Sequence, residues 1–87
     1  MIFLVERDLP GATLEQLAAA QKAAIMAGKE LTAKGRAVRY IRSTFVPGEG
    51  RCMCLFEAET ADLVREANEL AKLPFVRIVP AEDLTPL

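Results

Sequence analysis

The segment VRYIRSTFVPGEGRCMCLFE, residues 38–57, decides the fold of this 87-residue chain. Two runs rich in β-branched, aromatic and other apolar residues, 38–46 and 51–57, flank the compact turn 47–50 and predict an antiparallel hairpin. A four-residue turn pairs Val46 with Arg51. It then places three pairs opposite each other: Phe45 with Cys52, Ser43 with Cys54, and Ile41 with Phe56. These residues share one face, because side chains alternate along a strand.

The two faces of the predicted hairpin differ in character. The first is largely apolar, so we expect it to lie beneath the helices. The second mixes apolar bulk with a phenol, a guanidinium and a carboxylate, and it carries Tyr40, Arg42, Thr44, Met53, Leu55 and Glu57. The second face is therefore the predicted ligand-binding face.

A helix is predicted on each side of the hairpin. Thr13 and Gln16 form a capping box before a helix over 14–34, and Thr60 caps a second helix that runs through Leu70. The apolar runs 2–7 (IFLVER) and 75–79 (FVRIV) predict the first and last strands of the chain. The resulting order, β-α-β-β-α-β, is the ferredoxin-like α+β arrangement, a four-stranded antiparallel sheet with strands one and three central and both helices on one face. We expect residues 1–87 to form a single domain of this kind.

The central strands suggest a second copy of the chain. Residues 2–5 and 52–56 are apolar on both faces, without the alternation of a sheet that is exposed on one side. A single layer of helices covers only one face, so the other needs a cover. A homodimer formed through the open sheet face, a dimeric α+β barrel, is the simplest solution.

Composition excludes several classes of function. The net charge of −1 argues against a general electrostatic grip on nucleic acid or on an anionic membrane. The chain has no histidine, which excludes Ser-His-Asp and Cys-His catalytic pairs and histidine zinc sites. We find no signal peptide or membrane span, and Cys52 and Cys54 lie one residue apart, so we expect reduced thiols and a cytoplasmic location.

Four segments carry a resemblance: FLVERDLP at 3–10, VRYIRSTFV at 38–46, CLFEAETADLVREAN at 54–68 and LPFVRIV at 73–79. The chain resembles a family of small bacterial ferredoxin-like domains of unknown function, typified by an actinobacterial nickel-binding protein. This resemblance implies a ferredoxin-like domain that dimerises. It also suggests bound nickel. Family members commonly carry histidine around the second strand and second helix, whereas this chain has Arg42 and Asn68 in those neighbourhoods. Imidazole is the natural nickel ligand, so nickel and other metals are not predicted.

The cysteines and the strand-end carboxylates each have two interpretations. Cys52 and Cys54 are either a two-thiolate site or small buried hydrophobes, and their predicted position under the helices favours the latter. Glu6 and Glu57 are either acid–base groups or ion-paired strand ends. Ion pairing is favoured for Glu6. A Glu57 carboxylate packed against Met53 and Leu55 would have a raised pKa, which suits proton transfer.

The remaining candidates concern ligand recognition. Tyr40 and Arg42 are expected to bind an anionic or phenolic ligand or to lie in the dimer interface, and the two roles are compatible. Asn68 has no structural role that the sequence indicates, so it remains a candidate ligand-binding residue.

These features support two functions. The first is a homodimer without turnover that binds a small ligand or, as the family resemblance implies, a metal. Its ligand-binding site is Tyr40, Arg42, Thr44, Met53, Leu55, Glu57, Glu6 and Asn68. The second is a cofactor-free enzyme of the dimeric barrel type, an isomerase, cyclase or monooxygenase, that acts on an anionic aromatic or polyketide-like substrate with Glu57 as acid or base. A third hypothesis is a purely structural interaction domain. The sequence assigns no catalytic residue and no cofactor, and the expected partners are a second copy and a small organic ligand.

Overall fold

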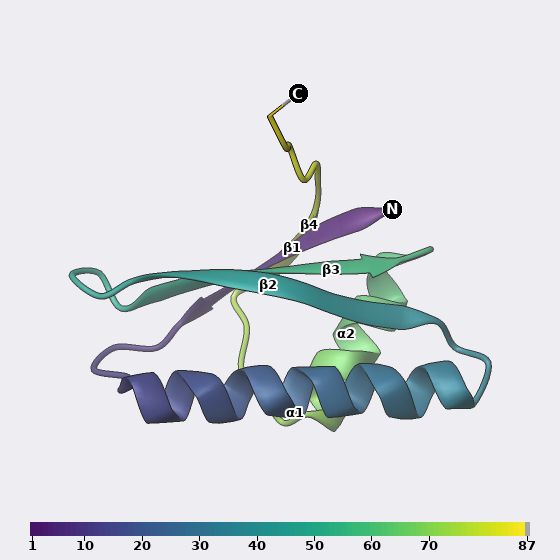
Figure 1. The fold of residues 1–87 in the computed structure, drawn as a ribbon, viewed down its shortest axis with the longest axis horizontal. Coiled ribbons are helices and arrows are strands. Elements are labelled where there is room, and N and C mark those ends of the chain that lie inside the picture. The colour runs from purple at the N-terminus through teal and green to yellow at the C-terminus, as the bar shows by residue number, and fades with distance from the viewer. Residues whose placement is uncertain (87) are drawn as a thin grey trace.

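The computed structural model describes residues 1–86 and has six elements of regular structure. In chain order they are β1 (Ile2–Asp8), α1 (Leu14–Ala33), β2 (Val38–Val46), β3 (Arg51–Ala58), α2 (Ala61–Leu70) and β4 (Arg77–Ala81). The four strands form one antiparallel sheet in the order β2-β3-β1-β4, and both helices lie on the same face of it (Figure 1). The predicted ferredoxin-like fold is confirmed, with β1 and β3 at the centre.

Both helices begin where their capping residues predict. Thr13 accepts a hydrogen bond from the Gln16 backbone, and the Gln16 side chain accepts one from the Thr13 backbone, which completes the capping box of α1. Thr60 accepts from the Leu63 backbone at the start of α2. Near its end, α1 comes so close to β2 that a Cβ on Gly28 would lie 3.0 Å from the Val38 carbonyl oxygen. Gly28 is thus buried at a helix–strand contact, and the helix continues past it.

The last strand differs from its prediction. It begins at Arg77 rather than at residue 75 and runs through Pro80 to Ala81. Val76 precedes it, is 60% exposed, and donates its backbone N–H to the Glu6 carbonyl over 2.7 Å. Proline is tolerated in β4 because β4 pairs only with β1, as an edge strand.

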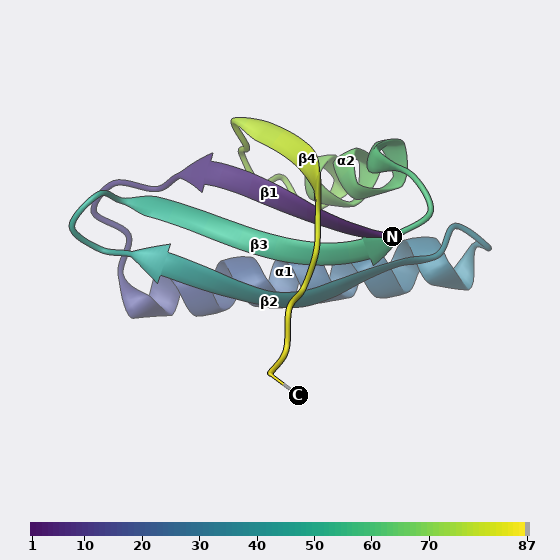
Figure 2. The same ribbon diagram turned by 90° about the horizontal axis from the view of Figure 1, so that it is seen from above.

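The core lies between the sheet and the helices. Alternate residues of β1 and β3 point into it, and Val5, Phe56 and Val64 are fully buried at 0% exposure. Cys52 and Cys54 are also buried on this side, as the predicted register requires. The opposite sheet face carries no helix, and the residues after β4 cross above it (Figure 2).

A β-bulge divides β2 and corrects one part of the predicted register. From Val46 to Arg42 the pairing with β3 is as predicted, but Tyr40, and not Ile41, lies opposite Phe56. Ile41 is the extra residue, and a one-residue bulge reverses the alternation of the strand beyond it. Tyr40 therefore lies on the helix side of the sheet, and its predicted place on the open face is wrong.

Candidate functional site

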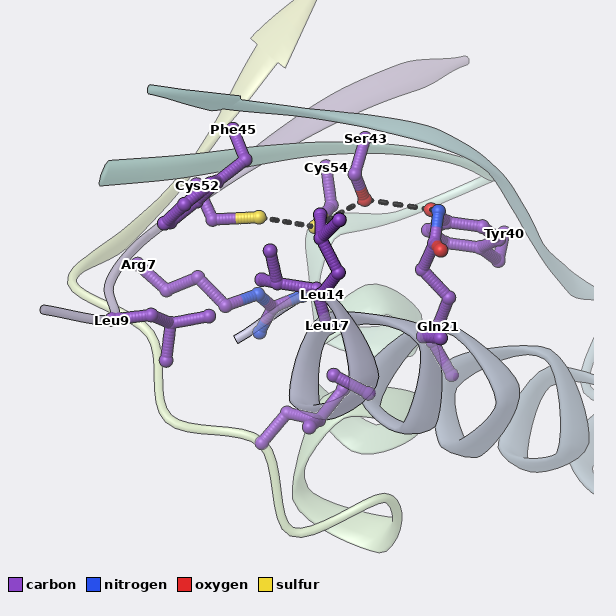
Figure 3. A pocket seen from close by; sticks show the side chains of 14 residues that line it. Arg7, Leu9, Leu14, Leu17, Gln21, Tyr40, Ser43, Phe45, Cys52 and Cys54 are labelled. Atoms are coloured by element: carbon purple, nitrogen blue, oxygen red, sulfur yellow. Dashed lines mark hydrogen bonds between the residues drawn. The ribbon is translucent and has the colours of Figure 1, made fainter. Parts of the chain in front are cut away.

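A cavity of about 200 Å³ lies between α1 and the sheet (Figure 3). Its lining is mostly apolar and includes Leu14, Leu17, Ala20 and Ala24 of α1, Phe45 of β2, and Leu9 and Leu73 of loops. Its polar lining residues are Arg7, Gln21, Tyr40, Ser43, Cys52 and Cys54. We call it the helix-side cavity. Leu14, in the first turn of α1, lines the cavity and is 84% exposed.

Arg7 is the charged residue of the helix-side cavity. It follows Phe3 and Val5 on the core face of β1 and is only 2% exposed. Its Nη1 donates to the Pro74 carbonyl oxygen over 3.1 Å and its Nη2 to Asn68 Oδ1 over 2.9 Å. Both partners are neutral, and the ion pairs found among residues 1–86 do not include Arg7. A positive charge is therefore buried without a protein counter-ion, which costs several kcal/mol.

Asn68 has the structural role that the sequence did not indicate. It is 1% exposed on α2, and its Nδ2 donates to the Val64 carbonyl oxygen over 2.8 Å while its Oδ1 accepts from Arg7. Both polar atoms of the Asn68 amide are therefore hydrogen-bonded inside the core. Asn68 positions Arg7, which itself borders the cavity.

A chain of hydrogen bonds forms a second polar wall. Gln21 Nε2 donates to the Tyr40 hydroxyl over 2.8 Å, and Ser43 Oγ donates to Cys54 Sγ over 2.9 Å. The Tyr40 and Ser43 hydroxyls lie 2.6 Å apart. Because the single Ser43 proton is directed to Cys54, Tyr40 is the donor between them. The chain therefore runs from α1 through β2 to the Cys54 sulfur on β3.

The two thiols lie side by side at the cavity. Their sulfurs are 3.8 Å apart, and both cysteines are free. Burial, followed by the neighbouring Cys54, raises the pKa of the Cys52 thiol to about 11, although Arg7 acts in the opposite direction. Cys52 is consequently a neutral thiol at pH 7.

Of the predicted open-face residues, Tyr40 and Glu57 border a second hollow between α1 and the start of β2, and the other four do not line it. Arg42 forms an ion pair with Asp83 beyond β4, and Met53 and Leu55 are partly buried on the helix-free face. Thr44 is exposed on that face, away from Tyr40. Of the residues predicted as the site, Tyr40 and Asn68 belong instead to the helix-side cavity and its support.

Both strand-end glutamates are ion-paired. The predicted pairing of Glu6 is found: a hydrogen bond from Arg77, with Arg51 nearby, holds the pKa of Glu6 below its ordinary value. Glu57 pairs with Arg39 over 2.8 Å, and this hydrogen bond holds the pKa of Glu57 below its ordinary value. The expected rise in that pKa is wrong, because the bulge brings Arg39 directly opposite Glu57.

The burial of Arg7 had a signal in the sequence, although Arg7 was not among the predicted site residues. Phe3, Val5 and Arg7 alternate on one face of an apolar central strand, so a charge at position 7 had to enter the core. Gln21 and Ser43 gave no such signal, since each became a partner of Tyr40 only through the bulge.

Metal-binding clusters and membrane-spanning helices are not found in the part of the chain that the structure describes. Within residues 1–86, no three or more His, Cys, Asp or Glu side chains are grouped so that they could hold a metal ion. No helix in this range is long and apolar enough to cross a membrane.

Comparison with known proteins identifies a family. No curated protein sequence matches the chain. The crystal structure of SCO4226 from Streptomyces coelicolor A3(2) matches with a TM-score of 0.80 at 24% identity, over 95% of this chain and 100% of that one, and this likeness shows the shared fold. The model of the SCO4226-like family, described as nickel responsive proteins, matches residues 3–80. The resemblance seen in the sequence is thus confirmed, and the chain belongs to the SCO4226-like family.

Proposed function

We propose that this protein binds a small ligand in the helix-side cavity and has no turnover of its own. The observation that carries this proposal is the cavity itself, a mostly apolar space of about 200 Å³ with polar groups on two sides. Small-molecule sites are typically apolar with a few placed polar groups. An apolar cavity of about 150 Å³ suffices to bind benzene, so this one has room for a substituted ring or a short chain.

Nickel, which the family description suggests, does not fit the residues of this chain. Nickel sites favour imidazole, and the chain has no histidine. The two cysteines are the nearest approach to a ligand set, and they lack a third protein ligand within residues 1–86. A ligand other than nickel is therefore the better candidate.

Native mass spectrometry on protein purified from its own host, without added metal or chelator, tests the proposal. We expect a bound mass of a small molecule. In the variant Ala20→Leu, an added side chain fills the cavity and the mass should disappear. The matched control is Ala19→Leu on the same helix, which is exposed and does not line the cavity. Equal retention of the mass in both variants would place the ligand elsewhere and contradict the proposal.

We propose further that the protein is a homodimer formed through the open sheet face. The support is the apolar character of that face, where Ile2, Leu4, Met53, Leu55 and Val79 have no helix over them. A charge at its centre, Leu4→Lys, should convert a dimer to a monomer in light scattering, whereas Ala19→Lys on α1 should not. A wild-type monomer would overturn this part. A ligand site between two sheets, at Arg42, Thr44, Met53, Leu55, Glu6 and Glu57, stays a prediction that depends on the dimer.

The enzyme alternative gains no support from the geometry. It needs Glu57 as acid or base, and Glu57 is a half-exposed carboxylate paired with Arg39.

A cytoplasmic location stays a proposal, supported by two free thiols 3.8 Å apart, a pair that a reducing compartment preserves.

A further inference from the structure

The helix-side cavity contains an uncompensated charge. Arg7 is 2% exposed, and its two hydrogen-bond partners, Asn68 Oδ1 and the Pro74 carbonyl, are neutral acceptors. A guanidinium has five N–H donors, so further donors remain after these two bonds. Buried charges in proteins are normally paired, because desolvation is otherwise too costly.

The protein groups around the cavity do not supply the missing negative charge. The titratable groups that line it with Arg7 are Cys52, Cys54 and Tyr40. Burial raises the pKa of Cys52 to about 11, so this thiol is neutral at pH 7. The Tyr40 hydroxyl lies 2.6 Å from Ser43 Oγ and accepts from Gln21, and none of the ion pairs found among residues 1–86 joins it to Arg7. The part of the chain that the structure describes therefore holds no ion-pair partner for Arg7.

We propose that the ligand of the helix-side cavity is a small monoanion, a carboxylate on an apolar body of about benzene size, and that Arg7 binds the carboxylate. This inference rests on the proposed function and names its ligand class. A guanidinium and a carboxylate form charge-assisted, often bidentate hydrogen bonds, which are stronger than neutral ones. One negative charge balances Arg7 and leaves the buried site neutral.

The rest of the lining fits the apolar part of such a molecule. Leu14, Leu17 and Phe45 present hydrocarbon surface to the same space (Figure 3). The volume of about 200 Å³ exceeds that of a bare inorganic anion and accommodates a single ring with one carboxylate. A dianion would leave one charge unbalanced.

Calorimetric titration with matched probes tests the inference. Benzoate is compared with benzamide, and hexanoate with hexanol, so that each pair shares its body and differs in charge. We expect each carboxylate to bind at least roughly tenfold more tightly than its neutral partner, the ratio typical of one charge-assisted hydrogen bond.

Two variants assign the preference to Arg7. Arg7→Met removes the charge and should abolish the preference. Because this variant leaves Asn68 without its partner and risks misfolding, Asn68→Asp is the second variant. It loses the bond to the Val64 carbonyl but keeps the oxygen that accepts from Arg7 and adds a protein counter-ion. The carboxylate preference should therefore also collapse in folded Asn68→Asp. Glu69→Gln, one residue further along α2 and exposed, is the matched control and should keep the preference.

The outcomes separate the inference from the proposed function. Equal binding of charged and neutral probes, or a preference that survives in folded Asn68→Asp, overturns the monoanion and leaves a ligand-binding cavity. Binding of no probe of either kind, combined with no bound mass in the native protein, overturns both. A carboxylate preference that both variants remove supports the inference.

Discussion

Arg7 Nη2 donates a hydrogen bond to Asn68 Oδ1 over 2.9 Å, and this bond joins the centre of the sheet to α2 inside the core. The two residues are 61 positions apart and only 2% and 1% exposed. A central strand and a helix are thereby held together by polar groups where apolar contact would be usual. The pair also fixes the guanidinium at the wall of the helix-side cavity, so stability and ligand recognition depend on the same bond.

Asn68→Ala should destabilise the protein by about 2–4 kcal/mol. The substitution removes the bond to a buried charge and the bond to the Val64 carbonyl, and hydrogen bonds to charged groups are the costlier ones to lose. Urea unfolding measures the change. Glu69→Ala, on the exposed side of the same turn, should stay within about 0.5 kcal/mol of wild type. Similar values for the two variants would show that Arg7 does not depend on Asn68.

Gly50→Ala should lower the free energy of unfolding by at least about 2 kcal/mol. Gly50 has a φ of +64°, and a Cβ there would lie 2.7 Å from Pro10 Cα, so the substitution adds both backbone strain and a clash. The control is Gly48→Ala in the same turn, where a Cβ would meet no atom within 4 Å. We expect that variant to be neutral within about 0.5 kcal/mol. Equal effects of the two substitutions would refute the close approach of the turn to Pro10.

Stability should fall as the pH rises from about 9 to about 11. The pKa of Cys52 is raised from 9.0 to about 11 in the folded protein, so in this window the unfolded chain loses the proton while the folded chain keeps it. The folded state then binds more protons than the unfolded state, and the free energy of unfolding decreases with pH. Urea midpoints across this range measure the slope. Cys52→Ala should show a shallower slope, and an unchanged slope would exclude Cys52 as its source.

Tyr40 and Gln21 should be coupled energetically. A double-mutant cycle of Tyr40→Phe and Gln21→Ala should give about 0.5–1.5 kcal/mol, the net value of one hydrogen bond. The matched cycle of Tyr40→Phe with Arg42→Ala should give a value near zero, because Arg42 lies on the other face and pairs with Asp83. Coupling of Tyr40 to Arg42, with none to Gln21, would show that the Tyr40 phenol lies on the open face and would contradict the bulge.

Most of the fold could be predicted because it depends on local signals. Thr13, Gln16 and Thr60 are capping residues at helix starts, and the 47–50 turn fixes the hairpin register as far as Arg42. These effects act over a few residues and need no knowledge of the packed core.

The candidate site was harder to predict because it depends on one bulge and one buried charge. The extra residue Ile41 moves Tyr40 from the open face, where it was predicted, to the helix side. It also brings Arg39 opposite Glu57, so Glu57 is ion-paired and does not have the raised pKa that was predicted. No residue type in 38–46 marks a bulge, since Ile41 suits a regular strand equally well. The burial of Arg7 could have been inferred from its alternation with Val5, but its partner Asn68 is 61 positions away.

The bulge at Ile41 determines which side chains of β2 reach the cavity. If the same residues paired with β3 regularly, without the bulge, Ile41 would lie opposite Phe56 and the Tyr40 phenol would lie on the helix-free face. The chain Gln21–Tyr40–Ser43–Cys54 would break at its middle, and Glu57 would lose Arg39. When β2 segments are exchanged between relatives, the presence of the bulge between Val38 and Ser43 therefore decides which side chains reach the cavity.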